Sequence, residues 1–173
     1  DGEIYTATGY LYAKGEDPTS YNFQAPPFLK YLFGFSILIF GSPYYAQIAF
    51  GAALITLVYA LGLKIYKSST VPLFACVFLI MDPVFMEVSS NVLLDLGQAT
   101  FLLLYFYLVF FRKKQYFLQG IILGLLAASK FWAGPLFFVI LITAYKIYKK
   151  DFFIKKFAVH LIVAAVVFSL TYI

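Results

Sequence analysis

Charge along this chain is sorted by sign into alternating segments, and long apolar stretches separate them. Lys and Arg in short loops are retained on the cytoplasmic side of a membrane. The pattern therefore predicts that the acidic segments lie on the opposite, outer side. Ten of the thirteen basic residues form the cytoplasmic set, namely Lys64, Lys67, Arg112, Lys113, Lys114, Lys146, Lys149, Lys150, Lys155 and Lys156. Seven of the eight acidic residues form the outer set, namely Asp1, Glu3, Glu16, Asp17, Asp82, Glu87 and Asp95.

The composition supports a membrane protein. The chain is 63% hydrophobic and only 12% charged, whereas soluble domains are about 25% charged. Lysines at the predicted cytoplasmic edge account for the net charge of +5, so it implies no nucleic-acid partner. We expect an integral, multi-pass protein of the plasma membrane or endoplasmic reticulum type. Cys76 lies in an apolar run, which favours a small core residue.

Residues 1–43 are predicted to form an outer region. Apolar and aromatic side chains at helical spacing predict a short amphipathic helix lying on the membrane and ended by Gly15. A loop follows and closes at Pro26-Pro27, which forces an extended backbone. Residues 28–40 are apolar, but about 20 residues are needed to cross the hydrocarbon core. This segment is therefore predicted to be re-entrant or interfacial.

Residues 44–173 are predicted to form the transmembrane part of an all-α helical bundle, and the whole chain, 1–173, one membrane domain. Because the chain lacks an initiator Met and stops inside an apolar run, we expect it to be a piece of a longer protein, truncated at both ends. Residues 82–92 are predicted to be an outer loop or a short distorted helix. The expected apolar helical segments are 44–66, 71–81, 93–111, 117–128, 131–147 and 157–173.

Several acidic residues are candidates for chemistry. Asp1 and Glu3 are placed to act as a general base toward an acceptor hydroxyl, although solvated loop acids would look the same. Asp95 begins a long apolar helix, where the N-terminal dipole favours a carboxylate. An ionisable residue near membrane depth is also a functional candidate, so both interpretations stay open. Asp82 precedes Pro83, a pair that readily ends an element.

Basic residues offer a second set of candidates. Lys130 is the one basic residue inside a predicted hydrophobic hairpin, where it would pair with a lipid phosphate or an outer acid, or reach the interface as a snorkelling side chain. Lys30 is a candidate for a similar part. His160 is expected to make a polar packing contact. The sequence contains no Gly-rich phosphate loop, no Cys/His cluster and no Ser/His/Asp set, so a nucleotide is not expected as direct substrate.

Four segments recur in a recognisable order, namely Asp1-Gly2-Glu3-Ile4-Tyr5, Gln24 to Leu32, Ser89 to Asp95 and Gly120 to Lys130. This order resembles the GT-C membrane glycosyltransferases of the dolichyl-phosphate-mannose protein mannosyltransferase type, including the aminoarabinose transferase branch. Members carry an acidic pair in the first outer loop, a Pro-Pro-Leu segment before a short helix, a later Leu-Asp stretch and a Gly-rich hairpin with Lys. The chain departs from this pattern at Gly2, Ala25 and Asn91.

This resemblance implies a GT-C-like fold and transfer of a sugar from a polyprenyl-phosphate carrier to a protein, lipid or glycan acceptor on the outer face. It implies Asp1 as catalytic base, Glu3 in positioning of acceptor or donor, Asp95 in support of the site and Lys130 in a phosphate contact. Together with Lys30, the candidate from the residues themselves, Asp95 and Lys130 form the predicted substrate-binding set. No cofactor follows with certainty; a divalent metal stays open because scattered acids specify no ligand set. The alternatives are a transporter or flippase, for which broken helices and midplane charges are typical, and a membrane subunit without catalysis.

Overall fold

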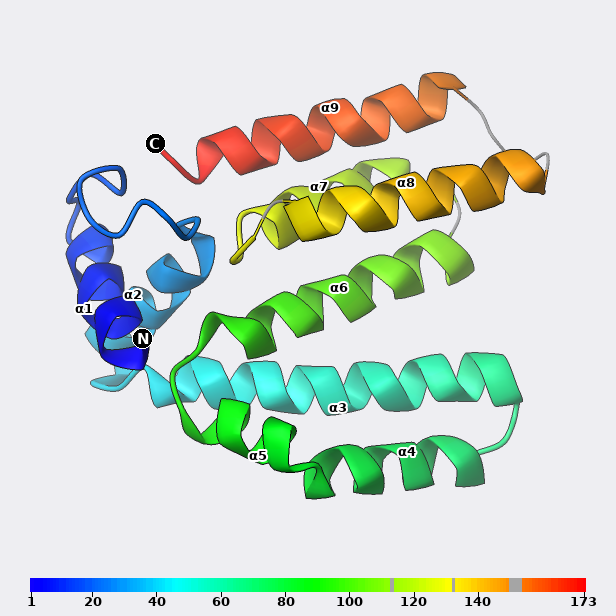
Figure 1. The fold of residues 1–173 in the computed structure, drawn as a ribbon, viewed down its shortest axis with the longest axis horizontal. Helices are drawn as coiled ribbons and strands as arrows, with labels where there is room; N and C mark the ends of the chain where they lie inside the picture. Colours follow the sequence, from blue (N-terminus) through cyan, green and yellow to red (C-terminus); the bar gives the residue numbers. More distant parts are fainter. Residues whose placement is uncertain (113, 132, 150–153) are drawn as a thin grey trace.

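The structure is a computed structural model, and it describes residues 1–112, 114–131, 133–149 and 154–173. Over these residues the chain is all-helical, as predicted, and contains no strand. Figure 1 shows long helices lying roughly side by side, with two short ones packed across one end. The helices are α1 (Gly2–Ala13), α2 (Phe28–Phe40), α3 (Tyr44–Tyr66), α4 (Thr70–Met81), α5 (Pro83–Ser90), α6 (Leu94–Phe111), α7 (Tyr116–Ala127), α8 (Ala133–Tyr148) and α9 (Ile154–Leu170).

Two of the described helices are long and apolar enough to cross a membrane. These are α3, with 23 residues, and α6, with 18 residues. Helices α4 and α5 meet at an angle of 64° and together would make a third span if they form one broken element. The helix α2 is apolar but short, in keeping with its predicted re-entrant or interfacial place.

Local capping explains where several helices stop. Gly41 ends α2 with φ of 76° and Lys67 ends α3 with φ of 53°, both in the left-handed region that terminates helices. Asp82 ends α4 and caps α5, because its Oδ1 accepts a hydrogen bond of 2.9 Å from the amide of Phe85. The segment 82–92 is therefore the short helix α5 followed by an extended stretch.

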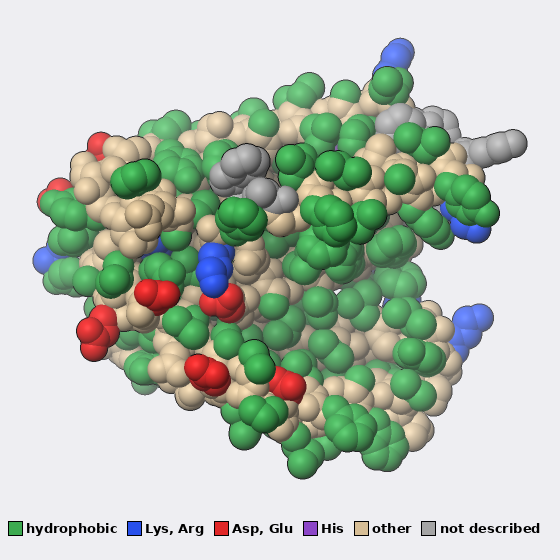
Figure 2. Space-filling model, viewed as in Figure 1, with side chains coloured by type: hydrophobic (Ala, Val, Ile, Leu, Met, Phe, Trp, Pro, Cys, Tyr) green, Lys and Arg blue, Asp and Glu red, His purple; other side chains and the backbone are tan. Residues whose placement is uncertain are grey.

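The helix order places opposite charges at opposite ends of the molecule. The C-terminal ends of α3, α6 and α8 and the N-terminal ends of α4, α7 and α9 meet at one end, which we call the basic end (Figure 1, right). Helices α1 and α2 lie at the other, acidic end. Figure 2 shows acidic side chains gathered toward that end and most Lys and Arg at the basic end. The side chain of Lys146 and the whole of Lys113 and Lys150 lie outside the described residues.

Two glycines allow α1 to cross α2 in backbone contact. A Cβ built on Gly34 would lie 1.9 Å from the backbone oxygen of Gly9, and one on Gly9 would lie 2.3 Å from that of Lys30. The buried face of α1 is small and partly polar, with Thr8, Gly9 and Tyr12. Helix α1 thus packs on α2 rather than presenting one apolar face, and Ile4 is exposed.

Helix α7 packs more closely against α9 than against α8, its partner in the predicted hairpin. A Cβ on Gly120 would lie 2.7 Å from the backbone oxygen of His160, and one on Gly124 would lie 2.6 Å from that of Ala164. These small residues, four apart on α7, let α9 approach its backbone, which is the usual way helices pack within a membrane. Spacing of apolar residues does not reveal this partner choice.

We predict that Gly34→Ala disrupts the α1–α2 contact. The new methyl group meets backbone rather than a flexible side chain, so overpacking should outweigh the gain of about 1 kcal/mol in helix propensity and lower stability by about 2 kcal/mol or more. Thermal unfolding in maltoside micelles checks this. Gly51→Ala is the matched control, because its Cβ would lie 3.7 Å from the nearest atom, a Leu96 methyl, and should be neutral or stabilising. Equal melting temperatures for both variants would contradict the packing.

We predict that residues 1–43 and 82–92 face the outer side of the membrane, and that residues 64–70, 112–116 and 146–156 face the cytoplasm. The sorting of charge to the two ends of the helices is the reason. Single cysteines in a chain with Cys76 replaced, treated with an impermeant reagent, measure this. A cysteine at position 17 that reacts only after permeabilisation would reverse the orientation.

Candidate functional site

An ion pair between two helical segments lies at the acidic end. The Nζ of Lys130 donates to Oδ1 of Asp95 at 2.6 Å, and both side chains are partly exposed, at 35% and 45%. Asp95 lies in the first turn of α6, where the helix dipole favours a carboxylate. Lys130 lies in the turn between α7 and α8. Of the two partners that the sequence left open for Lys130, the structure shows the outer acid.

The turn that carries Lys130 is fixed by contacts of its own. The carbonyl of Ala128 accepts a hydrogen bond of 3.2 Å from the amide of Phe28, at the start of α2. Ser129 is buried and donates to the carbonyl of Leu125 at 2.7 Å. On the other side, Nε2 of Gln98 lies 3.5 Å from the carbonyl of Phe131. The turn is therefore held against both α2 and α6, independently of the ion pair.

The approach to Asp95 is fixed by a buried amide on α3. Gln47 is fully buried, and its Nε2 donates to the carbonyls of Val88 and Asn91, at 2.7 Å each. The first carbonyl belongs to the last turns of α5, and the second to the connection between α5 and α6. Because a buried amide that loses its partners is costly, Gln47 holds the segment that leads into Asp95.

A small cavity lies beside the ion pair. It has a volume of about 250 Å³ and is lined by Asp95, Gln98 and Phe131 together with apolar residues of α6, α7 and α8, among them Phe138. Phe138 also lines a larger apolar groove, of about 890 Å³, between α3, α6 and α8. The small cavity and the groove therefore share the ring of Phe138 as part of their walls.

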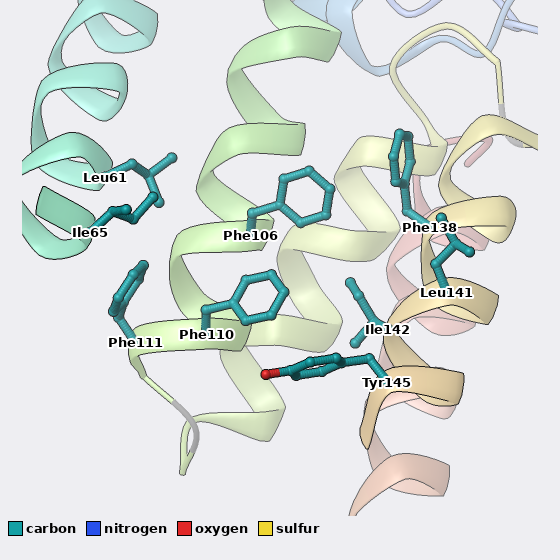
Figure 3. A pocket seen from close by; sticks show the side chains of 9 residues that line it. All are labelled: Leu61, Ile65, Phe106, Phe110, Phe111, Phe138, Leu141, Ile142 and Tyr145. Carbon is teal, nitrogen blue, oxygen red and sulfur yellow. The ribbon is translucent and has the colours of Figure 1, made fainter. Parts of the chain in front are cut away.

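Figure 3 shows how side chains from three helices frame the groove. Leu61 and Ile65 come from α3, Phe106, Phe110 and Phe111 from α6, and Phe138, Leu141, Ile142 and Tyr145 from α8. Figure 2 shows a hollow in this face of the molecule toward the basic end. An open, apolar groove of this kind suits a hydrocarbon chain, because its walls offer dispersion contacts and few polar partners.

The predicted catalytic acids lie at the same end as the ion pair. Asp1 precedes α1 and Glu3 lies in its first turn, and both are exposed. Gly2, between them, is in close contact with Val92, because a Cβ there would lie 3.1 Å from the Val92 carbonyl oxygen. Val92 precedes Asp95 by three residues, so the start of α1 lies against the segment that leads into α6.

Lys30 has a different environment from the one expected for a substrate contact. Its side chain has no exposed surface, and its Nζ donates to the carbonyls of Asn22 and Ala25 at 2.6 Å each. The ammonium also lies 5.5 Å from the centre of the Tyr12 ring. Lys30 thus binds the loop between α1 and α2.

Tyr12 and Asp17 also make hydrogen bonds that hold the loop between α1 and α2 in place. The Tyr12 hydroxyl contacts the carbonyls of Pro18 and Tyr21, and burial raises the pKa of Tyr12 to about 12. Asp17 accepts hydrogen bonds from the amide and hydroxyl of Thr19, which lower the pKa of the Asp17 carboxyl. The loop is therefore held in place over the N-terminal end of α2.

Sequence reasoning missed Gln47, Gln98 and the groove. An amide within a long apolar helix such as α3 was a usable signal for Gln47, because polar groups in such helices need partners. The groove depends on which helices neighbour each other, and no local pattern records that. Among the described residues, no group of three or more His, Cys, Asp and Glu side chains comes together as a metal site.

Comparison with known proteins gives no assignment: no family model, no curated protein and no solved structure matches the chain.

We predict that Lys30 makes stability depend on pH. Burial lowers its pKa to about 8 from the ordinary 10.5, so above about pH 8 the unfolded chain keeps a proton that the folded chain has released. Stability should therefore rise as pH increases from about 8 to about 9.5, below the range where tyrosines titrate. Melting temperatures across this range measure it. Lys30→Met should abolish the rise, and an equal rise in this variant would assign the effect to another group.

Proposed function

We propose that this chain is part of a membrane glycosyltransferase with a GT-C-like fold, which moves a sugar from a polyprenyl-phosphate donor to an acceptor on the outer face. The acceptor is a protein hydroxyl, a lipid or a glycan. In this proposal the protein is an integral, multi-pass membrane protein whose acidic end faces outward. The chain's own charge distribution and its resemblance to that family motivate the proposal.

The observation that carries the proposal is the position of the ion pair relative to the groove. Lys130 and Asp95 lie at the acidic end beside a small cavity, and Phe138 lines both this cavity and the larger apolar groove. A lipid phosphate has the same construction, with a charged head at the interface and a hydrocarbon chain within the bilayer. A donor that enters sideways from the bilayer would place its phosphate beside Lys130 and its chain along α6 and α8.

The proposed chemistry is one displacement at the anomeric carbon. The acceptor oxygen forms a bond to this carbon while the bond between the carbon and the phosphate oxygen breaks, and the leaving polyprenyl phosphate takes the electron pair. Asp1 accepts the proton of the acceptor hydroxyl, and Glu3 positions the reactants. Lys130 stabilises the charge that develops on the phosphate, and Asp95 is the partner of Lys130 before the donor binds.

Lys30 takes a positioning part in this proposal. Its ammonium holds the loop between α1 and α2, and α1 carries Glu3 and begins beside Asp1. The loop and the glycine contact between α1 and α2 therefore set the place of the proposed base. We assign donor contact to Lys130 and not to Lys30.

A transporter or flippase is the alternative function. The bend of 64° between α4 and α5 favours it, because broken helices are common in transporters. In such proteins, however, the ionisable groups lie near the middle of the membrane, whereas the paired Asp95 lies in the first turn of the long helix α6. The position of the charges therefore favours chemistry at the outer interface.

We predict that Asp1→Asn lowers the rate of sugar transfer by about 10²–10⁴-fold, because the amide keeps the size of the side chain but cannot accept the proton. Transfer of radiolabelled sugar from a panel of purified polyprenyl-phosphate sugars measures it. Glu16→Gln removes a charge from the same exposed outer region and should leave the rate unchanged. Wild-type rates in Asp1→Asn would remove Asp1 as the base and point to Glu3. Transfer from none of the donors by the unmodified chain would contradict the proposed function.

A further inference from the structure

The cation proposed to bind the donor phosphate already has an anion of its own. Lys130 lies 2.6 Å from Asp95, so a phosphate that approaches Lys130 meets a paired ammonium. We propose that Asp95 is a built-in competitor of the lipid phosphate: the phosphate displaces the carboxylate from Lys130 on binding, and the carboxylate returns on release. This inference rests on the proposed function, because it concerns regulation of the same phosphate site.

The geometry of the pair suits exchange. Both side chains are partly exposed, at 35% and 45%, so water and a ligand reach them from the mouth of the small cavity. An ammonium has three hydrogens, and Lys130 directs one of them to Asp95. A phosphate can therefore contact Lys130 before Asp95 has left. The carboxylate keeps favourable surroundings when displaced, because it stays in the first turn of α6 near the positive end of the helix dipole.

Displacement of Asp95 leaves the local fold in place. The turn that carries Lys130 is held by the hydrogen bond between Phe28 and Ala128 and by Ser129, and Gln98 contacts Phe131. The segment leading to Asp95 is held by Gln47. Because these contacts do not involve the ion pair, a phosphate needs to break only the pair itself. Partly exposed pairs are weak, which makes them replaceable by a ligand.

The negative charge of the lipid phosphate increases during transfer, so Asp95 would act differently on the donor and on the product. A polyprenyl-phosphate sugar is a phosphodiester with one negative charge, whereas the released polyprenyl phosphate is a monoester that carries about −1.5 to −2 at pH 7. A lysine without a competing anion would hold the product more tightly than the donor. Asp95 repels the dianion and replaces it on Lys130, so it favours release of the product.

Binding of farnesyl phosphate to the chain in dodecyl maltoside micelles, which contain no phosphate, tests the inference by calorimetry. Asp95→Asn should tighten binding about three- to tenfold, and Lys130→Met should weaken it about tenfold or more. In the Lys130→Met background, Asp95→Asn should have little effect, because the carboxylate acts through the lysine. Farnesol and inorganic phosphate are the comparison ligands, and both should bind at least tenfold more weakly than farnesyl phosphate.

Control variants separate competition from general charge and from misfolding. Glu87→Gln removes an exposed carboxylate from α5 without touching Lys130, and should change the affinity less than twofold. Asp95→Ser provides a second neutral variant at the pair, and thermal unfolding identifies variants that fold. A gain in Glu87→Gln equal to that in Asp95→Asn would overturn the inference, since net charge alone would then explain the gain.

The failures of the two proposals differ in this experiment. Equal affinity of the unmodified chain, Asp95→Asn and Asp95→Ser, together with weaker binding by Lys130→Met, would overturn the competitor while supporting the phosphate site. Absence of farnesyl phosphate binding in every variant would overturn the phosphate site, and the competitor with it. Inorganic phosphate that binds as tightly as farnesyl phosphate would contradict a lipid ligand.

Discussion

Over the described residues, the central turns of the long helices α3 and α6 hold no charged side chain, and the rest of the arrangement depends on this constraint. A Lys, Arg or Asp at the centre of a bilayer costs about 2.5–3.5 kcal/mol even on the most lenient scales. Antiparallel neighbours such as α3 and α4 therefore turn at basic segments on one side and at acidic segments on the other. The ion pair of Asp95 and Lys130 joins two such ends, so its position follows from the same constraint.

Small residues and the buried amide of Gln47 then determine which helices touch at the acidic end, and the charge distribution alone does not determine this. Gly9 and Gly34 bring α1 onto α2, and Gln47 ties the start of α6 to α3. A Cβ built on Gly97 of α6 would lie 2.7 Å from a methyl group of Leu29 of α2, so these two helices are in close contact. Helices α1, α2, α3 and α6 are thus packed together around the acidic end.

Sequence patterns predicted the helices well where a helix boundary has a local chemical cause. Gly41 and Asp82 mark helix ends by backbone conformation and capping, and the bounds of α2 and α3 match the predicted segments. Partner choice was not predictable, since the preference of α7 for α9 depends on close approach at Gly120 and Gly124. The sequence left both a lipid phosphate and an outer acid open as partners of Lys130, and it did not single out Asp95. The burial of Lys30 was not foreseen. Its ammonium is bound by two backbone carbonyls, and no pattern of side chains in the sequence reveals such partners.

The central claim is that a lipid phosphate binds with its head at Lys130 and its chain in the groove between α3, α6 and α8. Photo-crosslinking with a farnesyl phosphate that carries a diazirine at the far end of its chain, followed by peptide mass spectrometry, tests this most directly. We predict adducts on groove residues such as Phe106, Phe138 and Leu141, and competition by unlabelled farnesyl phosphate. Adducts spread over the exposed faces of α4 and α9, with no competition, would contradict it.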